Sequence, residues 1–448
     1  MKKSSLTEGN IGKALLFFVL PIIAGSLIQQ LYTTVDAVIV GQFTGKMGLA
    51  AIDSVYTLFK FPINFMNGLA AGATIIISGY FGAKEREGLH CAVRTALLVA
   101  FFLGIICSIG GVLLSPWLLD VMSVPEEVQG RSLIYCRIYF AGLWAMILYN
   151  MMAGILRAFG DSKRPLYVLI ICAVVNVVGD FLLVGVFHTG VGGAAAATVL
   201  SQAVSVVVLW VMLTKADFLE GTLAISKMKV CKEHMVMMIQ KGFPLALQSM
   251  LFPVANSIVQ ASVNTMGTDS IAAWGICDKL DLLIWLISDS MGPALTTYTA
   301  QNIGAGKQHR AKMGALVGTG ISVLAVGLIS IVLYFGSGVI GPWFIAKKDV
   351  DALIPLVVRY IRMMAPFFVF YAVAEAYSGA CCGLGETLVP MITTLLTICL
   401  FRVVAIFVVL PKFGTMECIV WIYIASWILA GCAFVVLYSI KERKLHKV

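Results

Sequence analysis

Residues 174–187 read VVNVVGDFLLVGVF, an apolar run that contains one carboxylate, Asp180, and one carboxamide, Asn176. Similar apolar runs recur along the whole chain of 448 residues, of which 60% are hydrophobic and only 12% are charged. Soluble domains carry about 25% charged residues, and a bilayer span needs roughly 20 apolar residues. The sequence therefore predicts an all-α integral membrane protein with twelve transmembrane helices.

The predicted spans follow one another with short connecting segments. They cover residues 14–40, 50–80, 92–115, 133–157, 166–188, 191–214, 236–264, 270–302, 313–336, 353–381, 388–411 and 417–440. The apolar stretch of the first span runs on to Val40, which is longer than the apolar region of a secretory signal. We therefore expect it to be a membrane helix of the mature protein.

Lys and Arg are concentrated in alternate connecting segments, starting with the N-terminal one. This bias predicts a multi-pass protein of the plasma (cytoplasmic) membrane with both termini in the cytoplasm. The net charge of +9 comes from the ends of apolar runs rather than from one basic face. We therefore expect no nucleic-acid partner.

Short motifs recur in the same order in the two halves of the sequence. Gly160-Asp-Ser-Lys-Arg-Pro165 corresponds to Gly385-Glu-Thr-Leu-Val-Pro390, and Pro21 corresponds to Pro244. Six spans per half place the halves the same way up, related by a pseudo-two-fold axis along the membrane normal. We expect an N-terminal six-helix bundle over residues 1–214, a cytoplasmic linker over 215–234 and a C-terminal six-helix bundle over 235–448.

Charged residues inside a span are functional candidates, because a charge at the bilayer centre costs at least about 2.5–3.5 kcal/mol. The alternative for each is a position near an interface, or a pairing that only fixes helix packing. Besides Asp36 and Asp180, the candidates for substrate binding or gating are Asp53, Asp278, Asp281, Asp289, Glu375 and Arg402.

Four oxygen-bearing side chains are expected in the outer half of the first bundle. Asn176 and Asp180 are four residues apart, so they share one face of the fifth span. Asp36 in the first span and Thr198 in the sixth lie at compatible depths, roughly 6–12 Å from the outer ends at 1.5 Å per residue. Two carboxylates, an amide and a hydroxyl suit Na⁺ or a proton rather than a soft metal. The alternative is a polar network that only holds helices together.

The second half does not repeat this set of oxygens. The positions that correspond to Asp36 and Asp180 are Val259 and Ala405. Arg402 and Asp281 have similar predicted depths, which suggests an ion pair that either stabilises the bundle or contacts a ligand. Glu375 lies deeper toward the cytoplasm and is a candidate for a separate proton or substrate group.

Several motifs resemble those of the multidrug and toxic compound extrusion (MATE) transporters, and the resemblance covers nearly the whole chain. They are Tyr32-Thr-Thr-Val-Asp36, Gly41, Asn67-Gly-Leu-Ala-Ala-Gly72, Gly82-Ala-Lys84, and Arg157-Ala-Phe-Gly-Asp161 followed by Pro165. The resemblance implies a V-shaped pair of six-helix bundles around a central cavity. It also implies alternating-access efflux of cationic, amphipathic, drug-like compounds in antiport with Na⁺ or H⁺.

The resemblance also implies a cation site. In archaeal and related bacterial members, the ligands of the N-terminal bundle map onto Asp36, Asn176, Asp180 and Thr198. Other members use a Glu of the seventh span for a site in the C-terminal bundle, and the corresponding stretch 245–252 has no carboxylate. We expect Na⁺ or H⁺ as the coupling ion, no cofactor, membrane lipid as the surroundings, and a monomer.

Two other transport functions stay open. A lipid-linked saccharide flippase shares the wider superfamily fold but needs a more cationic cavity, and a nutrient symporter would move its cargo inward. HExxH and GxSxG motifs are absent, so we expect no enzyme activity. The eleven cysteines show no metal-type spacing, and we expect them to be small apolar core residues.

Overall fold

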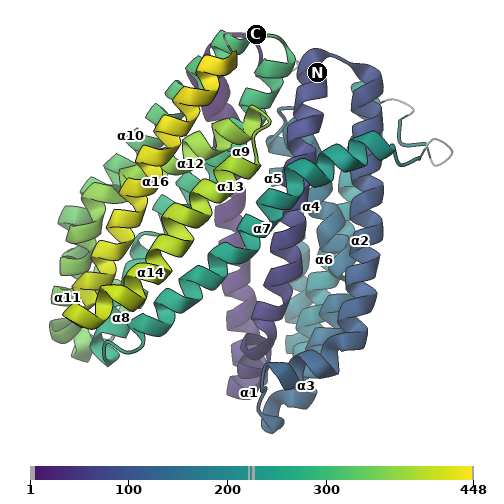
Figure 1. The fold of residues 1–448 in the computed structure, drawn as a ribbon. Helices are drawn as coiled ribbons and strands as arrows, with labels where there is room; N and C mark the ends of the chain where they lie inside the picture. Colours follow the sequence, from purple (N-terminus) through teal and green to yellow (C-terminus); the bar gives the residue numbers. More distant parts are fainter. Residues whose placement is uncertain (1–5, 220–221, 225–227, 446–448) are drawn as a thin grey trace. The chain divides into compact units, whose positions relative to one another are not determined.

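The computed structural model describes residues 6–219, 222–224 and 228–445, and almost all of them are helical (Figure 1). No β-strand occurs within these described ranges. Among the described residues, ten helical stretches are long and apolar enough to cross a membrane. The predicted all-α membrane fold is therefore confirmed.

Helix α1 and the eighth predicted span explain how ten stretches correspond to twelve predicted spans. Helix α1 (Ile11–Ala83) has 73 residues and is interrupted at Gly45, whose φ of 67° is a conformation that favours glycine. It therefore contains the first two spans. The eighth predicted span is not among the ten, because it is divided at Asp281 into α8 (Thr268–Leu280), which is too short, and α9 (Leu282–Gly304), which is long enough but not apolar enough.

The chain forms two compact units. Leu20–Ala246 form the first, and Leu247–Val448 together with Ser5–Val19 form the second. Besides most of α1, the first unit contains α2 (Arg86–Val121), α3 (Glu126–Ala141), α4 (Leu143–Ala158), α5 (Lys163–Asp180), the π-helix η1 (Phe181–Val186), α6 (Val191–Thr214), the 3₁₀-helix η2 (Asp217–Leu219) and the start of α7 (Lys232–Val263).

The second unit contains the rest of α7, then α8 and α9. These are followed by α10 (Gln308–Ile340), the 3₁₀-helices η4 (Gly341–Phe344) and η5 (Lys347–Asp349), α11 (Val350–Met364), the 3₁₀-helix η6 (Ala365–Phe367), α12 (Phe368–Gly383), α13 (Leu388–Thr394), the π-helix η7 (Leu395–Leu400), α14 (Phe401–Val408), α15 (Leu410–Phe413) and α16 (Met416–Leu445).

The N-terminal segment packs in the second unit, whereas the predicted N-terminal bundle began at residue 1. Leu6 is fully buried. The guanidinium of Arg310 donates hydrogen bonds of 2.7–3.3 Å to the backbone carbonyls of Leu6, Glu8 and Gly9. The acceptors are backbone carbonyls, which every residue has, so the segment carries no sequence motif for this contact. The comparison of motifs between the two halves therefore did not indicate it.

The described part of the predicted linker packs on the first unit. The ring of Phe218 contacts the rings of Phe81 and Phe159, with centroid separations of 5.5 and 4.4 Å. His90 Nε2 donates a hydrogen bond to the carbonyl of Phe218 at 2.9 Å. The compact first unit accordingly extends through the linker to Ala246.

Most cysteines have the expected role, but two do not. Nine are free thiols, and six of these are buried. Cys91 of α2 and Cys231, just before α7, form a disulfide across 140 residues of sequence. The expectation that all cysteines are simple core residues was wrong for this pair, because sequence spacing carries no information about such a distant contact.

Backbone turns recur at equivalent places in the two halves. Residues with positive φ form pairs separated by 222–225 positions: Gly45 with Gly267, Lys84 with Gly306, Gly160 with Gly385, and Gly190 with Gly414. These residues lie where helices end or are interrupted, so the recurrence preserves the helix boundaries of the repeat. Each half also contains a π-helical stretch, η1 or η7, in its fifth predicted span.

A helix crossing between small residues also occurs in both units. In the first, a Cβ on Gly154 of α4 would lie 2.9 Å from Thr74 Oγ1 of α1. In the second, Gly379 of α12 lies against Gly292 of α9, and Thr296 Oγ1 lies 3.0 and 2.9 Å from the carbonyl oxygens of Gly292 and Gly379. Close backbone approach gives membrane helices the van der Waals contact that holds them together.

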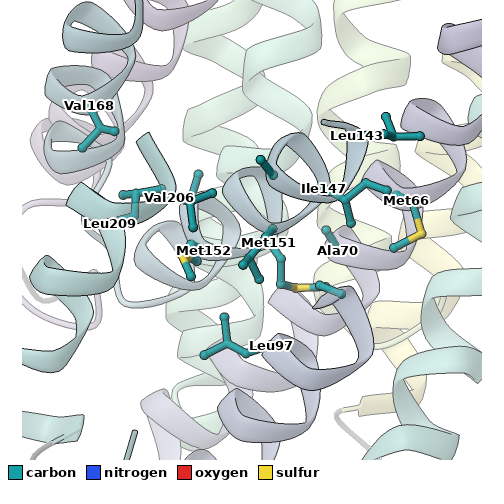
Figure 2. Packing of buried hydrophobic residues seen from close by; sticks show 14 of the residues in the cluster. Met66, Ala70, Leu97, Leu143, Ile147, Met151, Met152, Val168, Val206 and Leu209 are labelled. Atoms are coloured by element: carbon teal, nitrogen blue, oxygen red, sulfur yellow. The ribbon is translucent and has the colours of Figure 1, made fainter. Parts of the chain in front are cut away.

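Apolar side chains fill the centre of the first unit. Figure 2 shows Met66 and Ala70 of α1 near Ile147 of α4, with Met151 one turn further along α4. Most residues of α4 are buried, and its neighbours include α2 and α6. Helix α4 is therefore the central element around which the other helices of this unit pack.

Gly68 of α1 permits the close approach of α7, because a Cβ there would overlap the backbone of Ala246. We expect Gly68→Ala to lower the free energy of unfolding by about 1–3 kcal/mol, the usual cost of overpacking. The matched control is Gly79→Ala in the same helix, where the new methyl group would meet no atom within 4 Å. Thermal unfolding in detergent measures both variants, and equal melting temperatures would contradict the close crossing.

Candidate functional site

Asn176 and Asp180 lie on one face of α5 and point into the first unit. Their side chains are 1% and 0% exposed. Thr198 lies on α6, which packs along α5, and Asp36 lies in the first segment of α1. Asp36 interacts directly with Asp180, and Asn176 contacts Thr198. The structure thus brings together the four residues of the predicted cation site.

Hydrogen bonds orient the neutral members of this cluster. Asn176 Nδ2 donates to Thr198 Oγ1 at 3.4 Å. The Thr198 hydroxyl donates in turn to the carbonyl of Ala194, one turn earlier in α6, at 3.1 Å. The amide therefore uses its donor on α6, which leaves its carbonyl oxygen Oδ1 as an acceptor.

Four buried oxygen atoms of the cluster meet no hydrogen-bond donor from any residue in the described part of the chain. They are Asp36 Oδ1, Asn176 Oδ1, Asp180 Oδ1 and Asp180 Oδ2. Buried polar atoms are nearly always partnered, and an unpaired buried charge costs more than an unpaired neutral group. Such a set of acceptors is suited to a small hard cation or to a proton.

A π-helix begins directly after Asp180. The wider turns of η1 change the direction of side chains relative to α5, and π-helical stretches are frequent at functional sites. The rings of Phe43 in α1 and Phe181 in η1 meet edge to face at a centroid separation of 6.3 Å. A Cβ on Gly185 would lie 3.2 Å from the Phe43 ring. The helix end that carries Asp180 is thus packed against α1.

Tyr135 and Tyr139 of α3 were missed by the sequence analysis. Both interact electrostatically with Asp36, and Tyr135 also interacts with Asp180. Their rings stack at a centroid separation of 5.8 Å. Two tyrosines four residues apart in an apolar helix usually indicate ordinary packing. The signal that could have found them is depth, because both fall at the outer end of the fourth predicted span.

A shallow apolar groove of about 330 Å³ follows the two helices that carry the carboxylates. It is lined by Ile28, Leu31, Tyr32 and Val35 of α1 and by Ala173, Val174, Val177 and Val178 of α5. Val35 directly precedes Asp36, and Val177 directly follows Asn176. An apolar molecule in this groove would therefore contact the same helices as the cation cluster.

The other candidate residues do not join this cluster. Asp53 and Asp278 are exposed. In the second unit, the hydroxyl of Tyr371 donates to Asp289 Oδ1 at 2.9 Å. Glu375, one turn after Tyr371 in α12, interacts electrostatically with Asp289 of α9. The second unit therefore contains a carboxyl pair of its own, at positions that do not correspond to Asp36 and Asp180.

The ion pair predicted between Arg402 and Asp281 does not form, so this prediction was wrong. Arg402 is 1% exposed, and it donates to Ser426 Oγ at 2.8 Å and to Asn256 Oδ1 at 3.2 Å. Its guanidinium carbon lies 4.0 Å from the ring centroid of Tyr423. Similar depth along two helices does not fix the direction in which each side chain points around its helix axis.

Comparison with known proteins identifies the family. The MatE family profile matches this sequence twice, over residues 21–182 and 244–408. The probable multidrug resistance protein YoeA of Bacillus subtilis (strain 168) is 30% identical over 349 residues, which are 77% of this chain and 75% of that protein. The probable multidrug resistance protein YpnP of the same organism is 26% identical over 411 residues, which are 90% and 89% of the two chains.

A solved structure shares the whole fold. It is described as the outward-facing conformation of a multidrug resistance MATE family transporter of the MOP superfamily. Its TM-score is 0.91 at 20% sequence identity, over 100% of this chain and 99% of that chain. The two family matches cover both repeats and start at Pro21 and Pro244, the pair that the sequence comparison aligned. The chain therefore belongs to the MatE family, the multidrug and toxic compound extrusion transporters that its motifs resemble.

Proposed function

We propose that this transporter is a secondary active multidrug exporter that moves cationic, amphipathic, drug-like compounds outward in antiport with Na⁺ or H⁺. Membership of the family supports ion-coupled export, and the names of its relatives support drug-like cargo. The observation that carries the proposed ion site is the set of four donor-free buried oxygens on Asp36, Asn176 and Asp180.

Charge balance explains why this cluster attracts one positive ion. Two carboxylates in direct interaction, away from bulk water, repel each other and lose hydration. A Na⁺ ion recovers both costs through its bonds to the hard oxygens of Asp36, Asn176, Asp180 and Thr198. A proton on one carboxyl group removes one charge and creates a donor to the other oxygen.

Ion binding would then change which packing of the first unit is favoured. Without the ion, repulsion between Asp36 and Asp180 pushes α1 and α5 apart, and with the ion both helices are drawn to a common centre. Pro21 of α1 lacks a backbone donor, so the helix can bend there at low cost. Cargo and ion need not touch, because coupling requires only that they prefer different packings.

The expected chemistry of the cargo rests on two features of the first unit. The groove along α1 and α5 has an apolar lining, which suits the hydrophobic part of an amphipathic molecule. The neighbouring acidic pair favours cargo of positive charge. We also propose that both termini are cytoplasmic and that the protein acts as a monomer, with the orientation supported by the distribution of Lys and Arg.

Asp180→Asn and Asp36→Asn should each uncouple export from the ion gradient, because each removes one of the two charges that bind the ion. We expect gradient-driven efflux to be abolished while the variant still inserts into the membrane, because without the second charge ion binding no longer favours one packing over the other. Efflux of a fluorescent cationic dye from proteoliposomes measures the loss. Asp53→Asn is the matched control, since Asp53 lies on the same helix but is exposed. Full gradient-driven efflux in Asp180→Asn would refute the ion site.

Thr198→Val should distinguish Na⁺ from H⁺ as the coupling ion. The substitution removes a hydroxyl oxygen that could bind Na⁺ but leaves both carboxylates available to a proton. If Na⁺ is the ion, Na⁺-driven efflux should need a higher Na⁺ concentration in the variant, and if H⁺ is the ion, pH-driven efflux should be nearly unchanged. Proteoliposomes with the Na⁺ and pH gradients imposed separately give the answer, and a normal Na⁺ dependence in Thr198→Val would count against Na⁺ binding at this cluster.

The carboxyl pair Asp289 and Glu375 is proposed as a separate ion or cargo site in the second unit, supported by the shared partner Tyr371. Glu375→Gln should change the concentration dependence for cargo or ion but leave ion binding by the first cluster intact, because separate sites act independently. Calorimetric ion binding to Asp289→Asn and Glu375→Gln tests this. Complete loss of ion binding in Glu375→Gln would show that the two clusters are one site.

The alternative functions differ from this proposal in cargo charge and direction. A lipid-linked saccharide flippase would need cationic groups for the phosphate, whereas the cluster in the first unit is acidic. A nutrient symporter would move cargo in the same direction as the ion. The dye experiments above separate the three, because only an exporter of cations moves the dye against the direction of the ion.

A further inference from the structure

Cys91, Cys231 and His234 come together where the linker meets α2. Cys91 lies in the second turn of α2, Cys231 precedes α7, and His234 lies in the first turn of α7. One ligand atom from each of the three side chains lies within 4.8 Å of the other two. All three residues are partly buried. None of them belongs to the transport machinery described above.

Neighbouring groups hold these side chains in place without using their ligand atoms. The backbone N–H of Cys231 donates to Thr95 Oγ1 of α2 at 3.0 Å. The ring of His234 lies against the ring of Tyr80, with a centroid separation of 5.3 Å. The linker therefore reaches α2 in a fixed register, and the two sulfur atoms and the imidazole face one another because of it.

His234 provides an independent indication of a ligand. Its Nε2 atom is buried and has no hydrogen-bond partner among residues 6–219, 222–224 and 228–445. The nearby His90 is different, because its Nε2 donates to the carbonyl of Phe218 at 2.9 Å. Buried ring nitrogens without a partner are uncommon, and histidine is the commonest metal ligand in proteins.

We propose that Cys91, Cys231 and His234, with both cysteines as thiols, bind a thiophilic divalent metal ion of the Zn²⁺ type and thereby fasten the linker to α2. Two thiolates and one imidazole form a three-ligand set known from zinc sites with an open fourth position. Binding releases the two thiol protons, and the two resulting thiolates balance the charge of the ion.

The backbone spacing suits this metal set as well as the disulfide. The Cα atoms of Cys91 and Cys231 are 6.1 Å apart. Tetrahedral Zn–S bonds of about 2.3 Å place the two sulfur atoms about 3.8 Å apart, and two cysteine side chains can span this separation from Cα atoms 6.1 Å apart. Metal and disulfide exclude each other, because sulfur atoms bonded to one another are not thiolates.

The proposed orientation of the protein favours the thiol form. Lys215, Lys229 and Lys232 flank this region, and their positive charges place the linker in the cytoplasm. Cytoplasmic thiols are kept reduced. The form that binds metal is therefore the form expected in the cell.

Metal titration of the full-length protein tests the proposal. The protein is treated with a phosphine reductant, freed of it without exposure to air, and titrated with Co²⁺ and then with Zn²⁺. We expect one Co²⁺ per chain, a thiolate-to-metal charge-transfer band, and loss of that band when Zn²⁺ displaces Co²⁺. Cys91→Ser, Cys231→Ser and His234→Gln should each weaken Zn²⁺ binding by more than about 100-fold, because loss of a direct ligand costs more than the 10–100-fold loss typical of outer-shell partners.

Matched variants separate the metal site from other effects. Cys107→Ser on the same helix and His309→Gln, an exposed histidine of α10, should bind as the unaltered protein does. His234→Gln removes the imidazole and keeps both thiols. If His234 is not a metal ligand and the two cysteines only form a disulfide, the Zn²⁺ affinity of this variant should equal that of the unaltered protein. Size-exclusion profiles and dye efflux show that each variant is folded. The proposal is overturned if the reduced protein gives no charge-transfer band, or if Cys91→Ser or His234→Gln binds Zn²⁺ as tightly as the unaltered protein.

Discussion

The contact between the half-buried Asp36 and the fully buried Asp180 is the constraint that the helix packing of the first unit has to satisfy. An ionised carboxylate in a low-dielectric interior costs several kcal/mol unless opposite charge or donors compensate it. No hydrogen-bond donor from the described residues reaches either carboxylate oxygen of Asp180. The side-chain oxygen of Asn176 lies in the same cluster and is another acceptor without a donor. In the proposed mechanism, a positive charge at this place stabilises the helix packing, and its removal weakens the packing. The proposed transport cycle rests on this dependence, because it makes the arrangement of α1 and α5 sensitive to ion binding between them.

The two halves share a backbone plan but differ in chemistry. Paired turns such as Gly45 and Gly267, and the crossings at Gly154 and Gly379, keep the helix framework the same in both. These small residues lie outside the cluster of Asp36, Asn176, Asp180 and Thr198, so the framework does not constrain which polar groups occupy that place. The carboxylates of the first unit accordingly have apolar counterparts in the second, where a carboxyl pair comes from α9 and α12 instead.

Sequence patterns predicted the fold and much of the candidate site. They failed where the outcome depended on the direction in which a side chain points around its helix axis. Apolar runs fixed the spans, and the four-residue spacing of Asn176 and Asp180 placed both on one buried face of α5. The Arg402 pairing was wrong, because depth along a helix says nothing of the side chain's direction around it. The π-helix after Asp180 and the contact between Cys91 and Cys231 depend on tertiary packing across distant segments. Neither leaves a local signal in the sequence.

Helix α1 belongs to both compact units, since its first turns up to Val19 pack in the second and the rest packs in the first. The guanidinium of Arg310 donates hydrogen bonds to backbone carbonyls just before this helix begins. Asp36 lies in the part of the same helix that belongs to the first unit. The helix is not interrupted between Val19 and Leu20, so one continuous helix contributes residues to both units. A fusion partner attached ahead of Leu6 would therefore be tethered to the second unit, although in the sequence it stands next to the first.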